Sequence, residues 1–214
     1  TLTSPTQDAL LEFGRSIPTL RLLSIAAGIL RHDTICSLLR GEDHPKMEPS
    51  HFDTPWGRVS IGSEQDDVYR ESHLLIIDPG GDDVYVGVAG VSSDVLPVSV
   101  AIDWRGNDRY EKSAATGLFG LGVLIDFSGD DLYEGENGTQ ASGVGGVGLL
   151  IDREGNDTYI ATIGAQGFGL FGVGVLIDDQ GDDHYFCDML GQGAAGPSGV
   201  GLILDRVGDD TYRA

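Results

Sequence analysis

Basic residues and cysteine are scarce in this 214-residue sequence, and each scarcity argues against a class of function. Only 13 Lys and Arg stand against 34 Asp and Glu, which gives a formal charge of −21 at pH 7. A surface this acidic repels phosphate backbones, so nucleic acid is excluded as an expected partner. The two cysteines, Cys36 and Cys187, belong to no CxxC pair, which leaves two separate buried thiols or one disulfide.

Long apolar runs and catalytic motifs are also missing. No run of 18 apolar residues occurs, so no membrane-spanning helix is expected. GxSxG, HExxH and phosphate-loop motifs are absent as well. His44, His51, Asp53 and His73 could together ligate zinc, but their spacing is irregular. The sequence therefore indicates no particular reaction.

Glycine and acidic residues are abundant instead. The sequence contains 33 Gly. From Leu74 onward it contains 19 Asp and 4 Glu but only 6 Lys and Arg. The acids alternate with aliphatic runs such as Gly172–Ile177, which must be buried, so the high charge does not indicate disorder. A surface of this composition attracts cations.

The acidic residues belong to a repeat with one ten-residue pattern, seen as IIDPGGDDVY, AIDWRGNDRY, LIDFSGDDLY, LIDREGNDTY, LIDDQGDDHY and ILDRVGDDTY. We call its three acidic positions the first Asp, the second position (Asp or Asn) and the third Asp, and a Tyr closes it. The first aspartates are Asp78, Asp103, Asp126, Asp152, Asp178 and Asp205; the second positions are Asp82, Asn107, Asp130, Asn156, Asp182 and Asp209; the third aspartates are Asp83, Asp108, Asp131, Asp157, Asp183 and Asp210. A degenerate seventh copy, IGSEQDDVY, starts at Ile61.

The repeat predicts the fold. Its period settles near 26 residues, and each unit contains a β-branched strand, a Gly–Asp turn, a shorter strand and a second turn marked by Gln140, Gln166 or Gln192. Two strands per unit are too few for a propeller blade, and the short second strand does not suit a transmembrane barrel. We therefore expect an all-β protein: a parallel β-solenoid, like a β-helix or β-roll, of six to seven coils over residues 59–214.

Strand alternation predicts which side chains face the core. Counted back from the first Asp, positions −1, −3 and −5 are mostly Val, Leu or Ile, and we expect them to point inward. Positions −4 and −6 are mostly Gly or Ser, and with position −2 they would form a Gly-rich outer face. Position −2 is apolar in every coil: Ile76, Ala101, Leu124, Leu150, Leu176 and Ile203. Such a face needs a cover, either an intramolecular helix or a second copy in a homodimer.

The N-terminal part has a different pattern. Residues 1–41 predict a helical segment, in which Thr19–Arg40 is the longer helix, with Leu20, Leu23 and Leu30 among its apolar residues. We expect this segment to cap the open end of the solenoid, although it could instead be the remnant of an upstream domain. Residues 42–58 are polar and are predicted to be a linker.

The turn sequence resembles part of the calcium-binding nonapeptide of the repeats-in-toxin family, whose pattern is GGxGxDxUx with U a large apolar residue. GDDVY at 81–85 and GNDTY at 155–159 match it closely. The resemblance implies a parallel β-roll in which the third Asp and backbone carbonyls hold calcium between turns, while the Tyr packs inside. The match covers only about ten residues per coil, and the family's first Gly is here the first Asp.

Electrostatics also favour a cation. Coils stack about 4.8 Å apart, and like charges at that distance repel by about 1 kcal/mol per pair even in water. Ca²⁺ accepts six to eight oxygen ligands, so all eighteen residues at the three acidic positions are candidate metal ligands. Alternatively, the same side chains cap turn amides without metal.

The sequence thus favours a calcium-binding structural or interaction module of a secreted or cell-envelope protein. The alternative is a carbohydrate-active β-helix enzyme, for which the basic coil around Trp104, Arg105, Arg109 and Lys112 would be the site. Breaks in the repeat that converge on one cleft would favour the enzyme, and uniform coils would favour the module.

Overall fold

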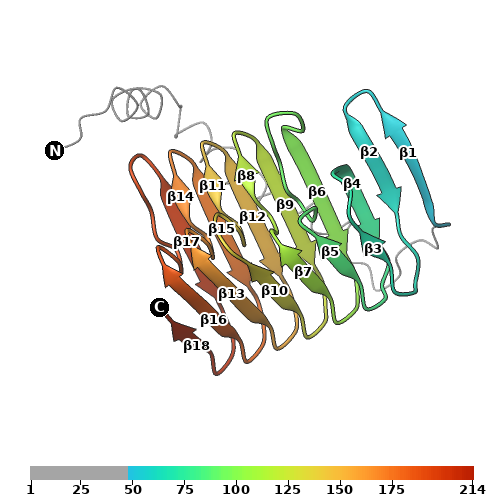
Figure 1. The fold of residues 1–214 in the computed structure, drawn as a ribbon. Coiled ribbons are helices and arrows are strands. Elements are labelled where there is room, and N and C mark those ends of the chain that lie inside the picture. Colours follow the sequence, from blue (N-terminus) through green and yellow to red (C-terminus); the bar gives the residue numbers. More distant parts are fainter. Residues whose placement is uncertain (1–47) are drawn as a thin grey trace.

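The protein is a parallel β-solenoid. The computed structural model describes residues 48–214, which form about five turns and contain strands but no helix (Figure 1). The count is lower than the six to seven coils predicted, and the first repeats are shorter than the rest: Tyr69 and Tyr85 are only 16 residues apart. The predicted helical cap, residues 1–41, lies outside the described residues. No helix that could cross a membrane is found between residues 48 and 214.

The longest sheet, sheet A, is formed by the strands that precede the acidic turns. Its eight strands are, in spatial order, β1 (Ser50–Thr54), β2 (Gly57–Ile61), β4 (His73–Asp78), β6 (Val98–Asp103), β9 (Leu121–Asp126), β12 (Val147–Asp152), β15 (Val173–Asp178) and β17 (Val200–Asp205). All neighbours pair in parallel except β1 and β2.

Two further sheets complete the coils. Sheet B holds the strands that follow the acidic turns: β3 (Val68–Tyr69), β5 (Val84–Val86), β7 (Arg109–Lys112), β10 (Leu132–Gly135), β13 (Thr158–Ile163), β16 (His184–Met189) and β18 (Thr211–Arg213). Sheet C is small and consists of β8 (Gly117–Leu118), β11 (Gly143–Val144) and β14 (Gly169–Leu170).

Equivalent positions of successive repeats pair in register. Leu150 pairs with Leu176 in sheet A, and Tyr133 pairs with Tyr159 in sheet B. The second turn is also repeated: the Gln140 side chain donates to the carbonyls of Tyr133 (2.9 Å) and Ile160 (2.8 Å). Gln166 and Gln192 make the same contacts, so the later coils are joined to one another at the second turn as well as through the sheets.

The core contains the tyrosines and position −2 of sheet A, which corrects the predicted strand parity. Tyr133, Leu124, Leu150 and Leu176 are fully buried together in one cluster. Positions −1, −3 and −5 point to the opposite, outer face of sheet A and form a separate aliphatic cluster. The inward direction of position −2 follows from the first Asp, whose side chain lies on the same face and reaches a core tyrosine.

The glycines at position −4 therefore point into the solenoid, and the predicted Gly-rich outer face does not exist. A Cβ added at Gly148 would lie 2.6 Å from the carbonyl oxygen of Ala115, and at Gly174 it would lie 2.6 Å from that of Ala141. The coil narrows at this level until two backbones nearly touch, which only glycine permits. In β6 the equivalent residue is Ser99, whose hydroxyl has room to donate to the His73 carbonyl at 2.8 Å.

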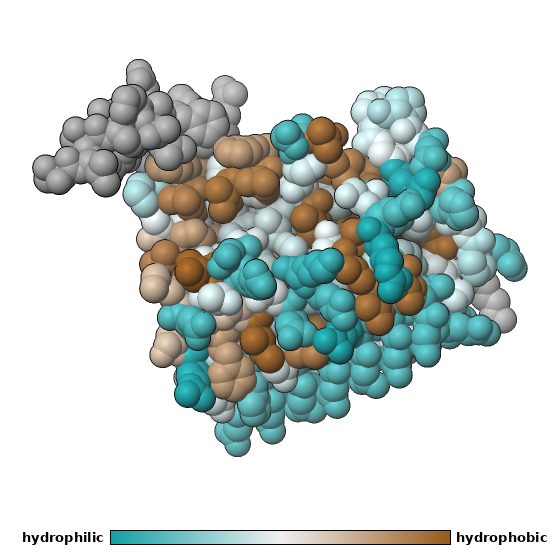
Figure 2. Space-filling model, viewed as in Figure 1, coloured by the Kyte–Doolittle hydropathy of each residue, from teal (hydrophilic) through white to brown (hydrophobic). Residues whose placement is uncertain are grey.

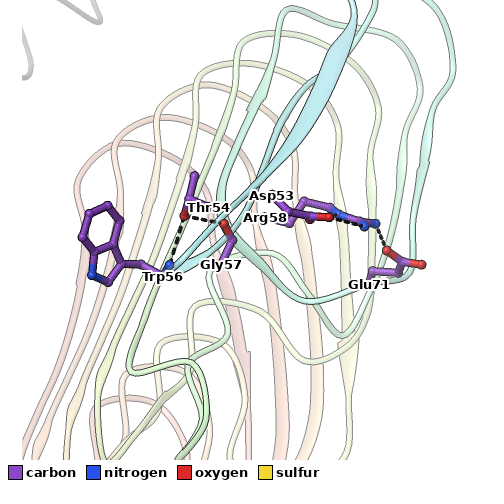
Figure 3. Close-up of polar contacts among 6 residues, drawn as sticks. All are labelled: Asp53, Thr54, Trp56, Gly57, Arg58 and Glu71. Carbon is purple, nitrogen blue, oxygen red and sulfur yellow. Dashed lines mark hydrogen bonds and ion pairs between the residues drawn. The ribbon is translucent and has the colours of Figure 1, made fainter.

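A hairpin closes one edge of sheet A. Strand β1 runs antiparallel to β2, and Arg58 makes ion pairs with Asp53, at 2.8 Å, and with Glu71 (Figure 3). The pairing lowers the pKa of Asp53, one of the four candidate zinc ligands; another, His44, lies outside the described residues. Residues 50–58, at the end of the predicted linker, thus contain β1 and the start of β2.

Candidate metal centre

The acidic turns lie along one edge of the solenoid. Each strand of sheet A from β4 onward ends on a first Asp, and each following strand of sheet B begins directly after a third Asp. Hydrophilic residues accordingly gather along the lower edge in Figure 2, where the turns join the two sheets in Figure 1. The turns themselves are exposed, but the first and third Asp of each complete central turn are buried.

The third aspartates form a ladder that runs the length of this edge. The backbone N–H of Asp131 donates to Oδ1 of Asp157 at 2.7 Å, and that of Asp157 donates to Oδ1 of Asp183 at 2.8 Å. The ladder continues in both directions, to Asp67 and to Asp210. In this way each third Asp uses one carboxylate oxygen to hold the coil before it.

The other oxygen of the third Asp has no such use. Within residues 48–214, no N–H or hydroxyl group donates to the buried Oδ2 atoms of Asp83, Asp108, Asp131, Asp157 and Asp183. A buried charged oxygen without a donor is costly, so these atoms need a proton or a cation. They are the strongest indication of a ligand in the described structure.

The second position forms a parallel but exposed ladder. The backbone N–H of Asn156 donates to Oδ1 of Asp130 at 2.8 Å, and that of Asp182 donates to Oδ1 of Asn156 at 3.0 Å. An amide oxygen accepts this bond as well as a carboxylate does, which explains why Asn and Asp interchange here. The second-position residues are thus turn-capping side chains, as the metal-free interpretation predicted for them.

The first aspartates bind the tyrosines. Tyr133 Oη donates to Oδ2 of Asp152 at 2.6 Å, and Tyr159 Oη donates to Oδ2 of Asp178 at 2.8 Å, so each of these tyrosines reaches the Asp of the next coil. The last two tyrosines differ: Tyr185 donates to Asp178 at 3.1 Å and Tyr212 to Asp205 at 2.6 Å, each within its own repeat. The tyrosine rings stack with centroids 4.6–4.9 Å apart along the whole solenoid. Inward placement of the tyrosines, implied by the family resemblance, is confirmed, although Tyr212 at the open end is 46% exposed.

First and third aspartates converge in triads. Within each triad one carboxylate oxygen per residue lies within 4.8 Å of the other two. The triads include Asp67, Asp78 and Asp83; Asp83, Asp103 and Asp108; Asp108, Asp126 and Asp131; Asp131, Asp152 and Asp157; and Asp157, Asp178 and Asp183. Consecutive triads share a third Asp, so the sites form a continuous row rather than isolated pockets.

Burial and mutual repulsion raise the pKa of these carboxyl groups. Burial is the main cause at Asp157 and Asp178, where it raises the pKa to about 8, and the charges of neighbouring aspartates add to it. At Asp126 and Asp183 the pKa rises to about 6, again mainly through burial. Without a cation the edge would therefore hold protons close to neutral pH.

Two parts of the site were missed in the sequence. Asp67 and Asp66 occupy the third and second positions of the degenerate copy. The backbone N–H of Asp67 donates to Oδ1 of Asp83, and Oδ1 of Asp66 accepts from the backbone N–H of Asp82. Gly62 stands where that copy would have its first Asp, and a Cβ there would collide with Asp78 and the Tyr69 hydroxyl. The recognised motif IGSEQDDVY contained the signal for Asp66 and Asp67.

In the basic coil, the Arg109 side chain is paired with acidic neighbours. Arg109 is paired with Glu111 at 3.0 Å and Glu134 at 2.9 Å, and Trp104 stacks on Phe127. Cys187 is a buried free thiol.

No family model, curated protein or solved structure matches this chain, so the candidate site rests on its own geometry.

Proposed function

We propose that the acidic edge binds a row of calcium ions, and that the protein is a calcium-stabilised structural or interaction module. The observation that carries the proposal is the row of buried, unpartnered Oδ2 atoms, each belonging to a third Asp that takes part in a triad. A cation beside them would satisfy the unpartnered oxygens and offset the repulsion within the row.

The donor set favours calcium over other metals. Every ligand of a triad is a carboxylate oxygen, the donor preferred by hard cations, and zinc or copper would instead want His or Cys. Ca²⁺ binds oxygen at 2.3–2.6 Å, so two ligands on one ion lie at most about 5 Å apart. The triad oxygens, within 4.8 Å of one another, meet that limit. Magnesium requires tighter octahedral geometry and should substitute poorly.

A module of this kind would complete its fold where free calcium is plentiful. Calcium sites in extracellular modules function at far higher ion concentrations than cytosolic sensors. We therefore propose a location outside the cytosol, at the cell envelope or in the extracellular medium. In such a setting the ions would act as clamps between successive coils.

The proposal is tested with Asp131→Asn and its neighbour Asp130→Asn in the full chain. Asp131 belongs to two triads, whereas Asp130 caps an exposed turn where other coils carry Asn. With excess calcium, Asp131→Asn should lower the melting temperature and the number of bound ions, and Asp130→Asn should change neither. At 100-fold excess over Kd, each lost site removes about 2.7 kcal/mol of stabilisation.

In chelator near pH 8, the change in melting temperature caused by Asp131→Asn should have the opposite sign. Asn resembles a protonated carboxyl group and needs neither a proton nor a cation, so Asp131→Asn relieves the repulsion within a metal-free edge and should raise the melting temperature. Melting curves and calcium titrations by calorimetry measure both effects. If wild-type protein, confirmed to be metal-free, melts at the same temperature with and without calcium, the edge is a proton-holding ladder and the proposal fails.

A further inference from the structure

The interior of the first coil is hollow, and the calcium proposal does not use this space. Two hollows of about 250 and 290 Å³ lie there, and both are lined by His51, Ser60 and Tyr69. Ser60 stands at position −2 of β2, counted from Gly62, so it faces inward as Leu124 does in a later coil. His51 lies directly opposite Ser60 on β1 and therefore shares its face. The first coil thus has polar side chains around a space that apolar side chains fill in later coils.

Tyr69, which lines both hollows, is the first ring of the tyrosine stack. The Tyr85 ring covers one of its faces, with centroids 4.9 Å apart, and the imidazole of His73 meets it edge-on at 5.9 Å. Tyr69 is 8% exposed, whereas Tyr85 is 1% exposed. Because Tyr85 covers one face, the accessible part of Tyr69 lies on the side away from Tyr85. A further aromatic ring on that side would continue the stack.

Nitrogen donors are concentrated around the larger hollow. Residues 48–214 contain eight Lys and Arg and three His, and two of these Arg and two of these His line it. Arg58 is already paired, with Asp53 at 2.8 Å and with Glu71 (Figure 3). Arg70 is exposed and takes part in none of the ion pairs between residues 48 and 214. Its guanidinium group is therefore available to a ligand in the hollow.

His73 gives an independent indication of a ligand. Its side chain lines the larger hollow, the residue is only 4% exposed, and no hydrogen-bond partner of its Nδ1 is found in the described part of the chain. Burial, and then the charge of Arg58, lower the pKa of His73 to about 4, so the ring is neutral at pH 7 and can donate one N–H. A buried polar atom without a partner is costly, and a ligand oxygen beside this ring would reduce that cost.

We propose that this space binds a small aromatic carboxylate, with its ring stacked on Tyr69 and its carboxylate held by Arg70. A carboxylate is the planar anion that a guanidinium group binds with two parallel hydrogen bonds, and His73 and Ser60 can donate to it as well. The formal charge of −21 repels polyanions, which favours a ligand with a single negative charge. A metal ion is disfavoured, because two guanidinium groups line the larger hollow and Arg58 already pairs with the carboxylates beside it.

Calorimetric titration of the full chain in calcium, with benzoate and acetate as probes, tests the site. Benzoate should bind, and acetate, which lacks the ring, should bind about tenfold more weakly or worse, because it cannot stack on Tyr69. Arg70→Gln should weaken benzoate binding by about tenfold or more, since it removes the charged fork. Arg109→Gln is the matched control: it removes the same charge from an arginine of β7 that lines neither hollow, and it should leave the affinity unchanged.

The histidine rings report where the probe binds. In NMR spectra of the wild type, benzoate should shift the ring signals of His73 and leave those of His184, exposed on β16, unchanged. Three results would overturn the proposal: no benzoate binding, equal affinities for benzoate and acetate, or equal benzoate affinities of the wild type and Arg70→Gln. Benzoate binding that leaves the His73 signals in place would also overturn it, because the probe would then occupy another part of the molecule.

Discussion

At the scale of single residues, aspartate has three roles along one turn, and its position decides which. The second-position side chains cap exposed amides, the first aspartates accept from tyrosine hydroxyls, and the third aspartates hold one amide and leave an oxygen free. A count of acidic residues cannot separate these roles. What separates them is the side of the backbone on which each carboxylate lies.

Two substitutions at Tyr133 should distinguish the stability contributed by its ring from that contributed by its hydroxyl. Tyr133→Phe keeps the stack but leaves Oδ2 of Asp152 without its donor, and should cost about 1–3 kcal/mol of unfolding free energy. Tyr133→Ala also opens a cavity and should cost about 3–5 kcal/mol, with or without calcium. Urea unfolding of the three proteins in calcium and in chelator measures these costs. Equal costs for Phe and Ala would show that the stacked ring contributes nothing.

At the scale of strands and turns, the sequence predicted much of the arrangement. The 26-residue period and the repeated Asp and Tyr predicted parallel in-register sheets and one acidic edge, because identical residues must stack in a solenoid. The face of each strand was predicted wrongly. Alternation of Gly with Val or Leu is compatible with either face of the strand pointing inward. It does not reveal that the backbones of Gly148 and Ala115 nearly touch inside the coil. The choice between a proton and a cation also depends on burial, which the motif does not show.

The narrow part of the coil gives a test at this scale. Gly148→Ala places a methyl group 2.6 Å from the Ala115 carbonyl oxygen and should destabilise the solenoid by about 1–3 kcal/mol through overpacking. Ser99→Ala, at the equivalent position of β6, fits without strain and should cost only its hydrogen bond, about 1 kcal/mol. Thermal unfolding compares the two. A neutral Gly148→Ala would mean that the coil can widen freely at this level.

At the scale of the whole molecule, the raised carboxyl pKa values predict an unusual pH response. A group whose pKa is higher in the folded than in the unfolded state stabilises the fold below its unfolded pKa, and this stabilisation is lost as pH rises through the folded pKa. For Asp157 and Asp178 that loss extends from the unfolded pKa up to about pH 8, and for Asp126 and Asp183 up to about pH 6.

In chelator, the melting temperature should therefore fall between about pH 5 and pH 8.5. Saturating calcium should remove most of the fall, because the ion replaces the protons, and its binding at pH 7 should release protons into a weakly buffered solution. Differential scanning calorimetry across this range, in chelator and in calcium, measures the response. A melting temperature that rises with pH in chelator would contradict the buried, proton-holding edge.

The shared third Asp also determines how such a molecule can change its length. Asp157 and Asp152 supply the acceptors for the Asp131 amide and the Tyr133 hydroxyl of the coil before them, and Asp130 supplies the acceptor for the Asn156 amide of the coil after it. A tandem duplication of one coil would thus bring its own complete set of partners, and the junction would be chemically identical to those already present. A substitution at one rung, by contrast, would be felt in two coils. The architecture tolerates insertion of whole units and resists change within them.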